Sequence, residues 1–160
     1  MADTDSDDQI HGRDYLTIAL DDDIFAMRVG SVHEVLDPPV MTRVPNAPSH
    51  APGLINVRGN VMPLVDLRKR FDMDEREDGE TTRVIVTEVE RLGETYFVGL
   101  KADAVYEVLD IAPEAIQPLP ENGTRWPRDL MSGVIQRDGR FVLLLDIANV
   151  VRGTGDANPQ

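Results

Sequence analysis

Apolar and polar residues alternate in short runs along most of the chain, and this pattern predicts β-strands. The runs Tyr15–Leu20 and Ile24–Met27 flank the polar turn Asp21–Asp23, which is typical of a β-hairpin. Further strands are expected at Gly53–Val57, Val61–Val65, Arg83–Val89, Thr95–Leu100, Gly133–Gln136 and Phe141–Leu145. The pattern therefore predicts a mostly β protein.

Two short helices are expected, each directly after a strand and an aspartate. Asp66 precedes Leu67–Phe71, and Asp146 precedes Ile147–Val151. An aspartate in this position accepts a hydrogen bond from a free N–H of the first turn, so both are predicted N-caps. The segment Met73–Thr82 is charged and has no apolar stripe, which favours a link between two halves of the chain.

An internal repeat supports this division into halves. Val32–Asp37 resembles Val105–Asp110, and further on Gly53–Leu67 resembles Gly133–Ile147. The two matches occur in the same order, and the second match ends in both halves at a strand followed by an aspartate-capped helical turn. This order indicates a duplication rather than two chance similarities.

The predicted organisation is a single domain, residues 14–152, made of two small β-barrel lobes of about five strands each. The lobes are expected at about 14–72 and 82–152, and one irregular sandwich with coincidental repeats is the alternative. The acidic segment 1–13 and the polar segment 153–160 contain little that a core could bury, so both are expected to be disordered tails.

Composition narrows the function classes. The formal net charge of -13 repels phosphate backbones and anionic lipid, so nucleic acid is not an expected partner. No apolar run approaches the roughly 20 residues that span a bilayer, and direct membrane insertion is not expected. The absence of cysteine excludes a disulfide framework and a thiolate site and fits the cytoplasm. An oligonucleotide-binding barrel is a remote alternative, because such a barrel needs a basic face with exposed aromatic residues.

No residue pattern indicates catalysis. His11, His33 and His50 have no partner at metal-ligand spacing, and the chain contains no nucleophile elbow or phosphate-binding loop. Asp21–Asp23 resembles a fragment of a calcium loop, but the glycine and the distal glutamate of that loop are missing. This segment is therefore interpreted as a solvated turn. The sequence predicts that the protein is not an enzyme and that it has no catalytic residue, metal site or cofactor.

A single arginine stands out in an otherwise apolar hairpin. Arg58 lies directly before Gly59, and the second half has Asp138 in the equivalent place, so the duplicated fold does not require the positive charge. Arg58 is either a turn residue in solvent or a guanidinium at the edge of an apolar groove, held by a carboxylate. Glu34 lies in an apolar segment of the same half. We therefore hypothesise a Glu34–Arg58 pair, whose charged groups lie within about 6 Å of each other.

Four stretches of the sequence resemble the CheW family of chemotaxis coupling proteins. They are Asp14–Leu20 with Phe25 and Ala26, Val32–Val35, Val44–Arg68, and Gly99–Leu109 with Gln117 and Pro118. Within the third stretch, Asn56–Gly59 followed by Pro63–Arg68 is specific to the family pattern. Together the stretches span about residues 14 to 151.

The resemblance implies two SH3/OB-like five-stranded β-barrel lobes related by a pseudo-two-fold axis, with a few short helices and with an exchange of segments between lobes as an option. It also implies a non-catalytic adaptor that couples methyl-accepting chemoreceptors to the histidine kinase CheA in signalling arrays. The expected partners are the cytoplasmic tip of the receptor and the regulatory domain of CheA, which has the same fold. A CheW-like scaffold of a chemosensory-type pathway with an output other than flagellar motility is the alternative.

The resemblance further places a receptor- and kinase-binding groove between the lobes. Carried over by position, the groove includes Val32, Glu34, Gly53, Asn56, Val57, Arg58, Gly59, Gly99, Val105 and Val108. The glycines at positions 53 and 99 are expected to let the backbone of a partner approach closely. The segment Gln117–Trp126 is expected near a kinase-facing or ring-facing surface.

Overall fold

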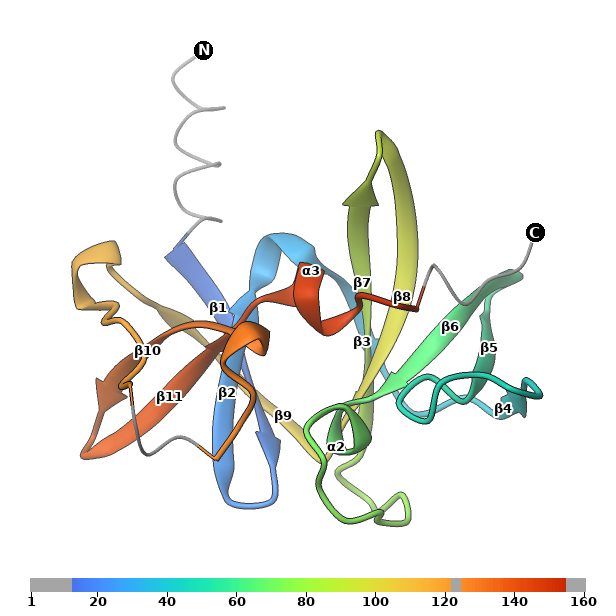
Figure 1. Cartoon of the computed structure of the whole chain (residues 1–160), viewed down its shortest axis with the longest axis horizontal. Helices are drawn as coiled ribbons and strands as arrows, with labels where there is room; N and C mark the ends of the chain where they lie inside the picture. The colour runs from blue at the N-terminus through green and yellow to red at the C-terminus, as the bar shows by residue number, and fades with distance from the viewer. Residues whose placement is uncertain (1–12, 122–124, 155–160) are drawn as a thin grey trace.

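Two β-sheets that lie side by side form the protein (Figure 1). The structure is a computed structural model that describes residues 13–121 and 125–154. The first sheet, named the terminal lobe, has the order β10-β11-β2-β1-β9. Its strands are β1 (Asp14–Leu20), β2 (Asp23–Arg28), β9 (Ala104–Asp110), β10 (Met131–Arg137) and β11 (Arg140–Leu145).

The second sheet, named the central lobe, has the order β3-β7-β8-β6-β5-β4. Its strands are β3 (Val32–Leu36), β4 (Met41–Arg43), β5 (Gly53–Val57), β6 (Asn60–Asp66), β7 (Arg83–Arg91) and β8 (Glu94–Ala102). This sheet has six strands rather than the expected five. The additional strand β4 is only three residues long, which is too short to produce a visible period in the sequence.

Short helices complete the described fold. The α-helices are α2 (Leu67–Arg70) and α3 (Ile147–Val150), and the 3-10 helices are η1 (Val29–Ser31), η2 (Pro113–Ala115) and η3 (Arg128–Leu130). Both predicted N-caps are confirmed, because the side chain of Asp66 accepts a hydrogen bond from the Arg68 N–H and that of Asp146 from the Asn149 N–H. Among the described residues, no helix has the length and apolar character that a bilayer crossing requires.

The order of the strands shows that the fold is duplicated and that the two halves of the chain exchange hairpins. Without β4, the central order β5-β6-β8-β7-β3 repeats the terminal order β10-β11-β2-β1-β9 strand for strand. Each sheet contains one parallel pair, β6 with β8 and β11 with β2, and each pair joins strands from opposite halves of the chain. The hairpin β1–β2 therefore belongs to the terminal lobe, and β7–β8 belongs to the central lobe.

The lobes therefore correspond to the halves expected at 14–72 and 82–152 only with an exchange of hairpins, which the family resemblance gave as an option. A sequence repeat shows which segments are equivalent, but it does not show which of two equivalent sheets a hairpin joins. The duplication also includes an irregularity in the pairing of two strands. The register of β3 against β7 shifts between Val32 and Glu34, and the register of β9 against β1 shifts between Val105 and Val108. The same interruption of the pairing therefore occurs at equivalent places of the repeat.

The hydrophobic core is divided into three clusters. One lies in the terminal lobe around Tyr15 and Leu144, and another lies in the central lobe around Ile55 and Val84. The largest cluster lies between the lobes. At its centre the ring of Phe25 lies 5.1 Å from that of Phe71 and 6.1 Å from that of Trp126. The alternative of a single sandwich is therefore wrong.

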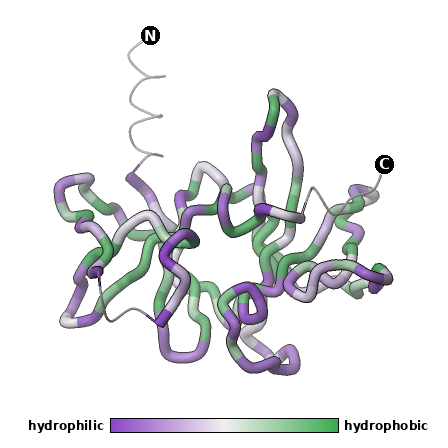
Figure 2. The backbone as a smooth tube through the Cα atoms, viewed as in Figure 1, coloured by the Kyte–Doolittle hydropathy of each residue, from purple (hydrophilic) through white to green (hydrophobic). Residues whose placement is uncertain are grey.

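The alternating pattern of each strand explains how one sheet serves two clusters. On β1, Leu16 and Ile18 face the shared cluster, whereas Tyr15 faces the core of the terminal lobe. On β7, Ile85 faces the shared cluster and Val84 faces the core of the central lobe. Successive side chains of a strand point to opposite faces, so both faces of these strands are buried. Figure 2 shows hydrophobic positions along the strands of both lobes and hydrophilic positions in the loops.

The described fold extends slightly into both predicted tails. Arg13 forms an ion pair with Asp110, with its Nε 3.0 Å from the carboxylate Oδ1. Thr154 is buried, and its backbone N–H donates a hydrogen bond to the carbonyl oxygen of Val151. The tail bounds at 13 and 153 are therefore wrong by one and two residues. The remaining tail residues, 1–12 and 155–160, lie outside the described residues.

Candidate functional site

The predicted pair of Glu34 and Arg58 is confirmed. The guanidinium Nη1 of Arg58 lies 2.5 Å from the carboxylate Oε2 of Glu34. Glu34 is on β3 and Arg58 follows β5, and three strands separate β3 from β5 in the sheet order. The contact forms because the sheet of the central lobe curves back on itself, as the walls of a barrel do.

The turn after β5 aims the arginine. Arg58 and Gly59 both have positive φ angles, 52° and 89°, and the side chain of Asn56 accepts a hydrogen bond of 2.8 Å from the Gly59 N–H. Two successive positive φ angles are typical of the tight hairpin turns that match strand twist. Asp138 and Gly139 of the terminal lobe repeat this backbone, with φ angles of 53° and 78°. The duplication therefore preserves the turn but not the charge.

The pair combines a held carboxylate with an accessible guanidinium. The side chain of Arg58 is 72% exposed, whereas that of Glu34 is 21% exposed. The hydrogen bond from Arg58 is the main cause that lowers the pKa of Glu34 below its ordinary value of 4.5. The same hydrogen bond raises the pKa of Arg58. Because a guanidinium has five N–H donors, most donors of Arg58 stay available to a partner.

Replacing Arg58 by alanine is expected to raise the pKa of Glu34. The folded-state pKa lies below the ordinary value, so the pair stabilises the fold above about pH 4.5 and loses that effect as the pH falls through the folded-state pKa. Carbon-detected NMR titration of the glutamate carboxyls measures this shift. The variant Arg137→Ala removes an exposed arginine beside the equivalent turn of the terminal lobe and serves as control. An unchanged Glu34 titration in the Arg58 variant contradicts the pairing in solution.

The predicted valines divide into two groups. Val32 and Val105 are partly buried against the shared cluster, so these equivalent positions of the repeat lie at the junction of the lobes. Val108 is exposed on β9, an edge strand of the terminal lobe. Val57 instead is buried in the core of the central lobe and offers no surface to a partner. Its assignment to the groove is therefore corrected, because the strand period turns Val57 inward.

The interpretation of the two glycines also needs correction. A side chain at Gly53 would place its Cβ 2.3 Å from the carbonyl oxygen of Thr42 on the neighbouring strand β4. At Gly99 the Cβ would lie 2.9 Å from Ile55 Cδ1, inside the core of the central lobe. Both glycines are buried, and their missing side chains make room for the protein itself rather than for the backbone of a partner.

The segment expected at a kinase-facing surface is partly internal. Trp126 is buried in the shared cluster, where its ring lies 5.9 Å from that of Phe71. The guanidinium carbon of Arg125 lies over the same indole, 4.3 Å from the ring centroid. Residues 122–124 lie outside the described residues. A surface role of this segment therefore excludes Trp126 itself.

A charge network centred on the buried Arg68 joins the lobes, and it was not predicted from the sequence. Arg68 of α2 has one Nη1 atom 2.7 Å from the carboxylates of both Asp21 and Asp103. Its Nε donates a hydrogen bond to the carbonyl oxygen of Asp74. Arg76 adds a weaker contact at 3.2 Å from Asp103. Asp21 lies in the β1–β2 turn of the terminal lobe, so the turn predicted to be merely solvated is anchored to the central lobe.

The network also changes acidity. The hydrogen bond from Arg68 is the main cause that lowers the pKa of Asp21. One signal in the sequence could have indicated the network, since the second half has Ala148 where the first has Arg68. An arginine that the duplicated fold does not require indicates a specific interaction of that arginine. The same comparison of the two halves drew attention to Arg58, and it applies equally to Arg68.

The described residues contain no group of three or more histidine, cysteine, aspartate or glutamate side chains that could hold a metal ion. What they contain is a duplicated β scaffold with an exposed guanidinium, held by a carboxylate, on its central lobe. A duplicated β fold that exposes a held guanidinium in this way is typical of a scaffold protein. The CheW-like domain family matches residues 14–154, and the chain belongs to this family.

Relatives of this chain support the assignment. The chemotaxis protein CheW of Rhizobium meliloti (strain 1021) is 31% identical over 139 residues, which is 87% of each chain. The chemotaxis protein CheW of Klebsiella aerogenes is 29% identical over 140 residues, 88% of this chain and 82% of that one. The crystal structure of the scaffolding protein TtCheW from Thermoanaerobacter tengcongensis superposes with a TM-score of 0.78 at 28% identity, covering 88% of this chain and 93% of that chain. The predicted family and its mostly β, two-lobed fold are confirmed.

Proposed function

We propose that this protein is a non-catalytic adaptor of chemosensory signalling that couples methyl-accepting chemoreceptors to the histidine kinase CheA. Its membership in the CheW-like family and its likeness to chemotaxis proteins and to a scaffolding protein support this function. The Glu34–Arg58 pair is the observation on which the proposal mainly rests, because an internal carboxylate positions a guanidinium whose remaining donors face solvent.

The proposed receptor-binding surface consists of the pair, the two valines at the junction of the lobes and the exposed Val108 of β9. Val32, Val105 and Val108 supply apolar contact, and Arg58 supplies directional hydrogen bonds. A helical receptor tip would lie across them with its apolar positions toward the valines, as in other helix-in-groove complexes. Burial of apolar surface would give most of the affinity, at roughly 25 cal/mol per Å², whereas the charged pair would fix register and exclude wrong partners.

Each single contact of this kind is weak, and an array strengthens it. Linking several binding events raises the overall strength without any new contact, because later events take place at a high effective concentration. An adaptor with two similar lobes is suited to this arrangement, since it presents two related surfaces. We propose that the protein acts in the cytoplasm and associates with membrane-bound receptor arrays through its partners.

Replacing Arg58 by alanine is expected to preserve the fold and to weaken receptor binding roughly tenfold, because it removes a charge-assisted hydrogen bond to the partner. Co-sedimentation with a receptor cytoplasmic fragment and CheA, together with control of kinase activity, measures the effect. The variant Arg137→Ala changes the same residue type on the terminal lobe and should bind normally. Normal receptor binding and normal kinase control by the folded Arg58 variant would count against the proposed site.

A further inference from the structure

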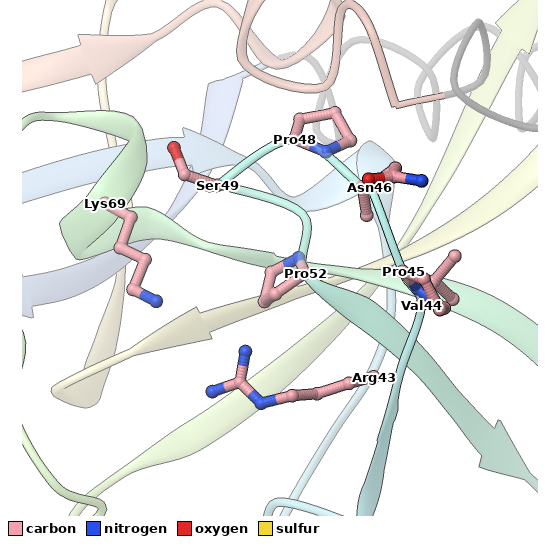
Figure 3. A pocket seen from close by; sticks show the side chains of 9 residues that line it. Arg43, Val44, Pro45, Asn46, Pro48, Ser49, Pro52 and Lys69 are labelled. Atoms are coloured by element: carbon pink, nitrogen blue, oxygen red, sulfur yellow. The ribbon is translucent and has the colours of Figure 1, made fainter.

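A basic depression lies at the opposite end of β5 from Arg58. It is open, has a volume of about 370 Å³, and is formed by the loop between β4 and β5 together with Lys69 of α2. Pro45, Pro48 and Pro52 form much of its wall. Figure 3 shows the side chains of Arg43 and Lys69 extending toward the same space, one from each side of Pro52.

The charges of this depression are poorly compensated, in a chain whose net charge is -13. Arg43 makes no ion pair or side-chain hydrogen bond with another described residue. The Nζ of Lys69 lies 3.8 Å from a carboxylate oxygen of Glu75, which is 72% exposed. An ion pair this exposed neutralises little of the lysine charge. Two cations that converge with so little compensation repel each other, and an anion between them relieves the repulsion.

A buried histidine lies in the same loop as the depression. The imidazole Nε2 of His50, in the same loop, is buried and has no hydrogen-bond partner among the described residues. Burial is the main cause that lowers the pKa of His50, and the charge of Arg70 lowers it further. The guanidinium of Arg70 is itself engaged with the carbonyl oxygens of Asn149 and Val150. Both causes favour the neutral imidazole, so the positive charge of the depression comes from Arg43 and Lys69.

The lining selects among anions. Proline has no backbone N–H, so the three prolines provide apolar surface and no donors. A phosphate group has three or more oxygens to satisfy and needs a denser set of donors. A carboxylate has two oxygens, which one guanidinium and one ammonium can satisfy, and its apolar neighbours can pack on the proline rings. Nucleic acid is disfavoured by the charge of the whole chain.

We propose that this pocket, with Arg43 and Lys69 at its rim and prolines along its wall, binds an acidic peptide segment of a partner protein, with a carboxylate between the two cations and an apolar side chain against the prolines. The site goes beyond the proposed function, because it is separate from Arg58 and gives the protein a second docking point. Its volume is at the lower end of the range for ligand pockets, which suits a short segment rather than a whole helix.

The test uses fluorescence anisotropy at low salt with the full chain and a labelled peptide that repeats Asp-Leu-Glu-Gly three times. Saturable binding is expected, together with an affinity loss of roughly tenfold for Arg43→Glu and a similar loss for Lys69→Glu. The variant Arg137→Glu makes the same charge change outside the pocket and is expected to bind as the unaltered chain does. Arg58→Ala is also expected to bind normally, so failure here and failure of the receptor site are distinguishable.

Several outcomes overturn the inference. Equal binding by the Arg43 and Lys69 variants, with unchanged thermal unfolding, shows that the pocket is not involved. Equal losses in the Arg137→Glu variant show general attraction between charges instead of a site. Equal binding of a peptide with Asn and Gln in place of Asp and Glu, or displacement by inorganic phosphate at a lower concentration than by free peptide, excludes carboxylate recognition.

Discussion

Replacing Arg68 by alanine is expected to lower the free energy of unfolding by about 3 kcal/mol, because it removes the most buried partner of the Asp103 carboxylate, which keeps only the exposed Arg76 and the Asp21 N–H. The side chain of Arg68 is 9% exposed and that of Asp103 is 13% exposed, so water compensates little for the lost contacts. Asp21 is more exposed and can regain hydration, which places the expected loss at the lower end of the range for broken buried pairs. The β1–β2 turn also loses its anchor to the central lobe.

Urea unfolding followed by far-UV circular dichroism measures this loss, and Arg76→Ala is the matched control. Arg76 contacts the same two carboxylates, at 3.2 Å from Asp103 and 3.6 Å from Asp21, but its side chain is 56% exposed. Its removal is expected to cost less than about 1 kcal/mol. Equal losses for the two variants would show that burial does not determine the strength of this network.

Several parts of the fold could be predicted because they depend on local patterns. The hairpin Tyr15–Met27, the two aspartate caps and the charged link Met73–Thr82 follow from the spacing of apolar residues and from capping chemistry, and all are present. The internal repeat predicted two similar sheets, and the strand order confirms them. Each of these signals lies within a few neighbouring residues of the chain.

The hairpin exchange could not be predicted from such signals. Hairpin β1–β2 could pair with β6 or with β11, and both partner strands have the same pattern in the two halves. The choice depends on the length and course of the connections between strands. The spacing of apolar residues gives no information about these connections. The short strand β4 was missed for a related reason, since it is defined by its partner β5 more than by its own three residues.

The candidate site also has features that could be predicted from the sequence and features that could not. The Glu34–Arg58 pair was predictable because each charge interrupts an apolar segment, and such a charge needs a partner. The burial of Val57 was not anticipated, although a strand period starting at the buried Ile55 places Val57 on the inner face. Arg68 was missed because it stands beside Lys69 and Arg70 on a short helix, where a basic residue is ordinarily solvated.

The charges of the molecule are less symmetric than its backbone. The backbone is duplicated, but the charges that hold and expose the candidate site occur in one half only. Arg58 corresponds to Asp138, and Arg68 corresponds to Ala148. A duplicated fold with unequal charges presents two surfaces of similar shape and different electrostatics, and such surfaces discriminate between partners. The two lobes therefore differ in charge at equivalent positions.

Replacing Gly53 by alanine is expected to lower the free energy of unfolding by about 3 kcal/mol, and this result separates the two interpretations of the glycine. The added Cβ would lie 2.3 Å from the carbonyl oxygen of Thr42, a backbone atom that cannot rotate away. Relief requires β4 to move from β5, and overpacking of this kind costs about 1–3 kcal/mol. At Gly133, the equivalent glycine, an added Cβ would lie 2.8 Å from Ile116 Cγ2 and 3.1 Å from the carbonyl oxygen of Gln117. At both equivalent positions, glycine is therefore required by close packing within the protein.

Thermal and urea unfolding measure the loss, and Gly30→Ala is the matched control, because an added Cβ at Gly30 meets no atom within 4 Å. That control is expected to change stability by less than about 0.5 kcal/mol. Receptor binding, measured well below the unfolding midpoint of the Gly53 variant, is expected to stay within about twofold of the unaltered chain per folded molecule, since the new methyl group points at β4. A variant with full stability and lost binding would instead place position 53 against the partner, because only an external contact can remove affinity without disturbing the strand beside it.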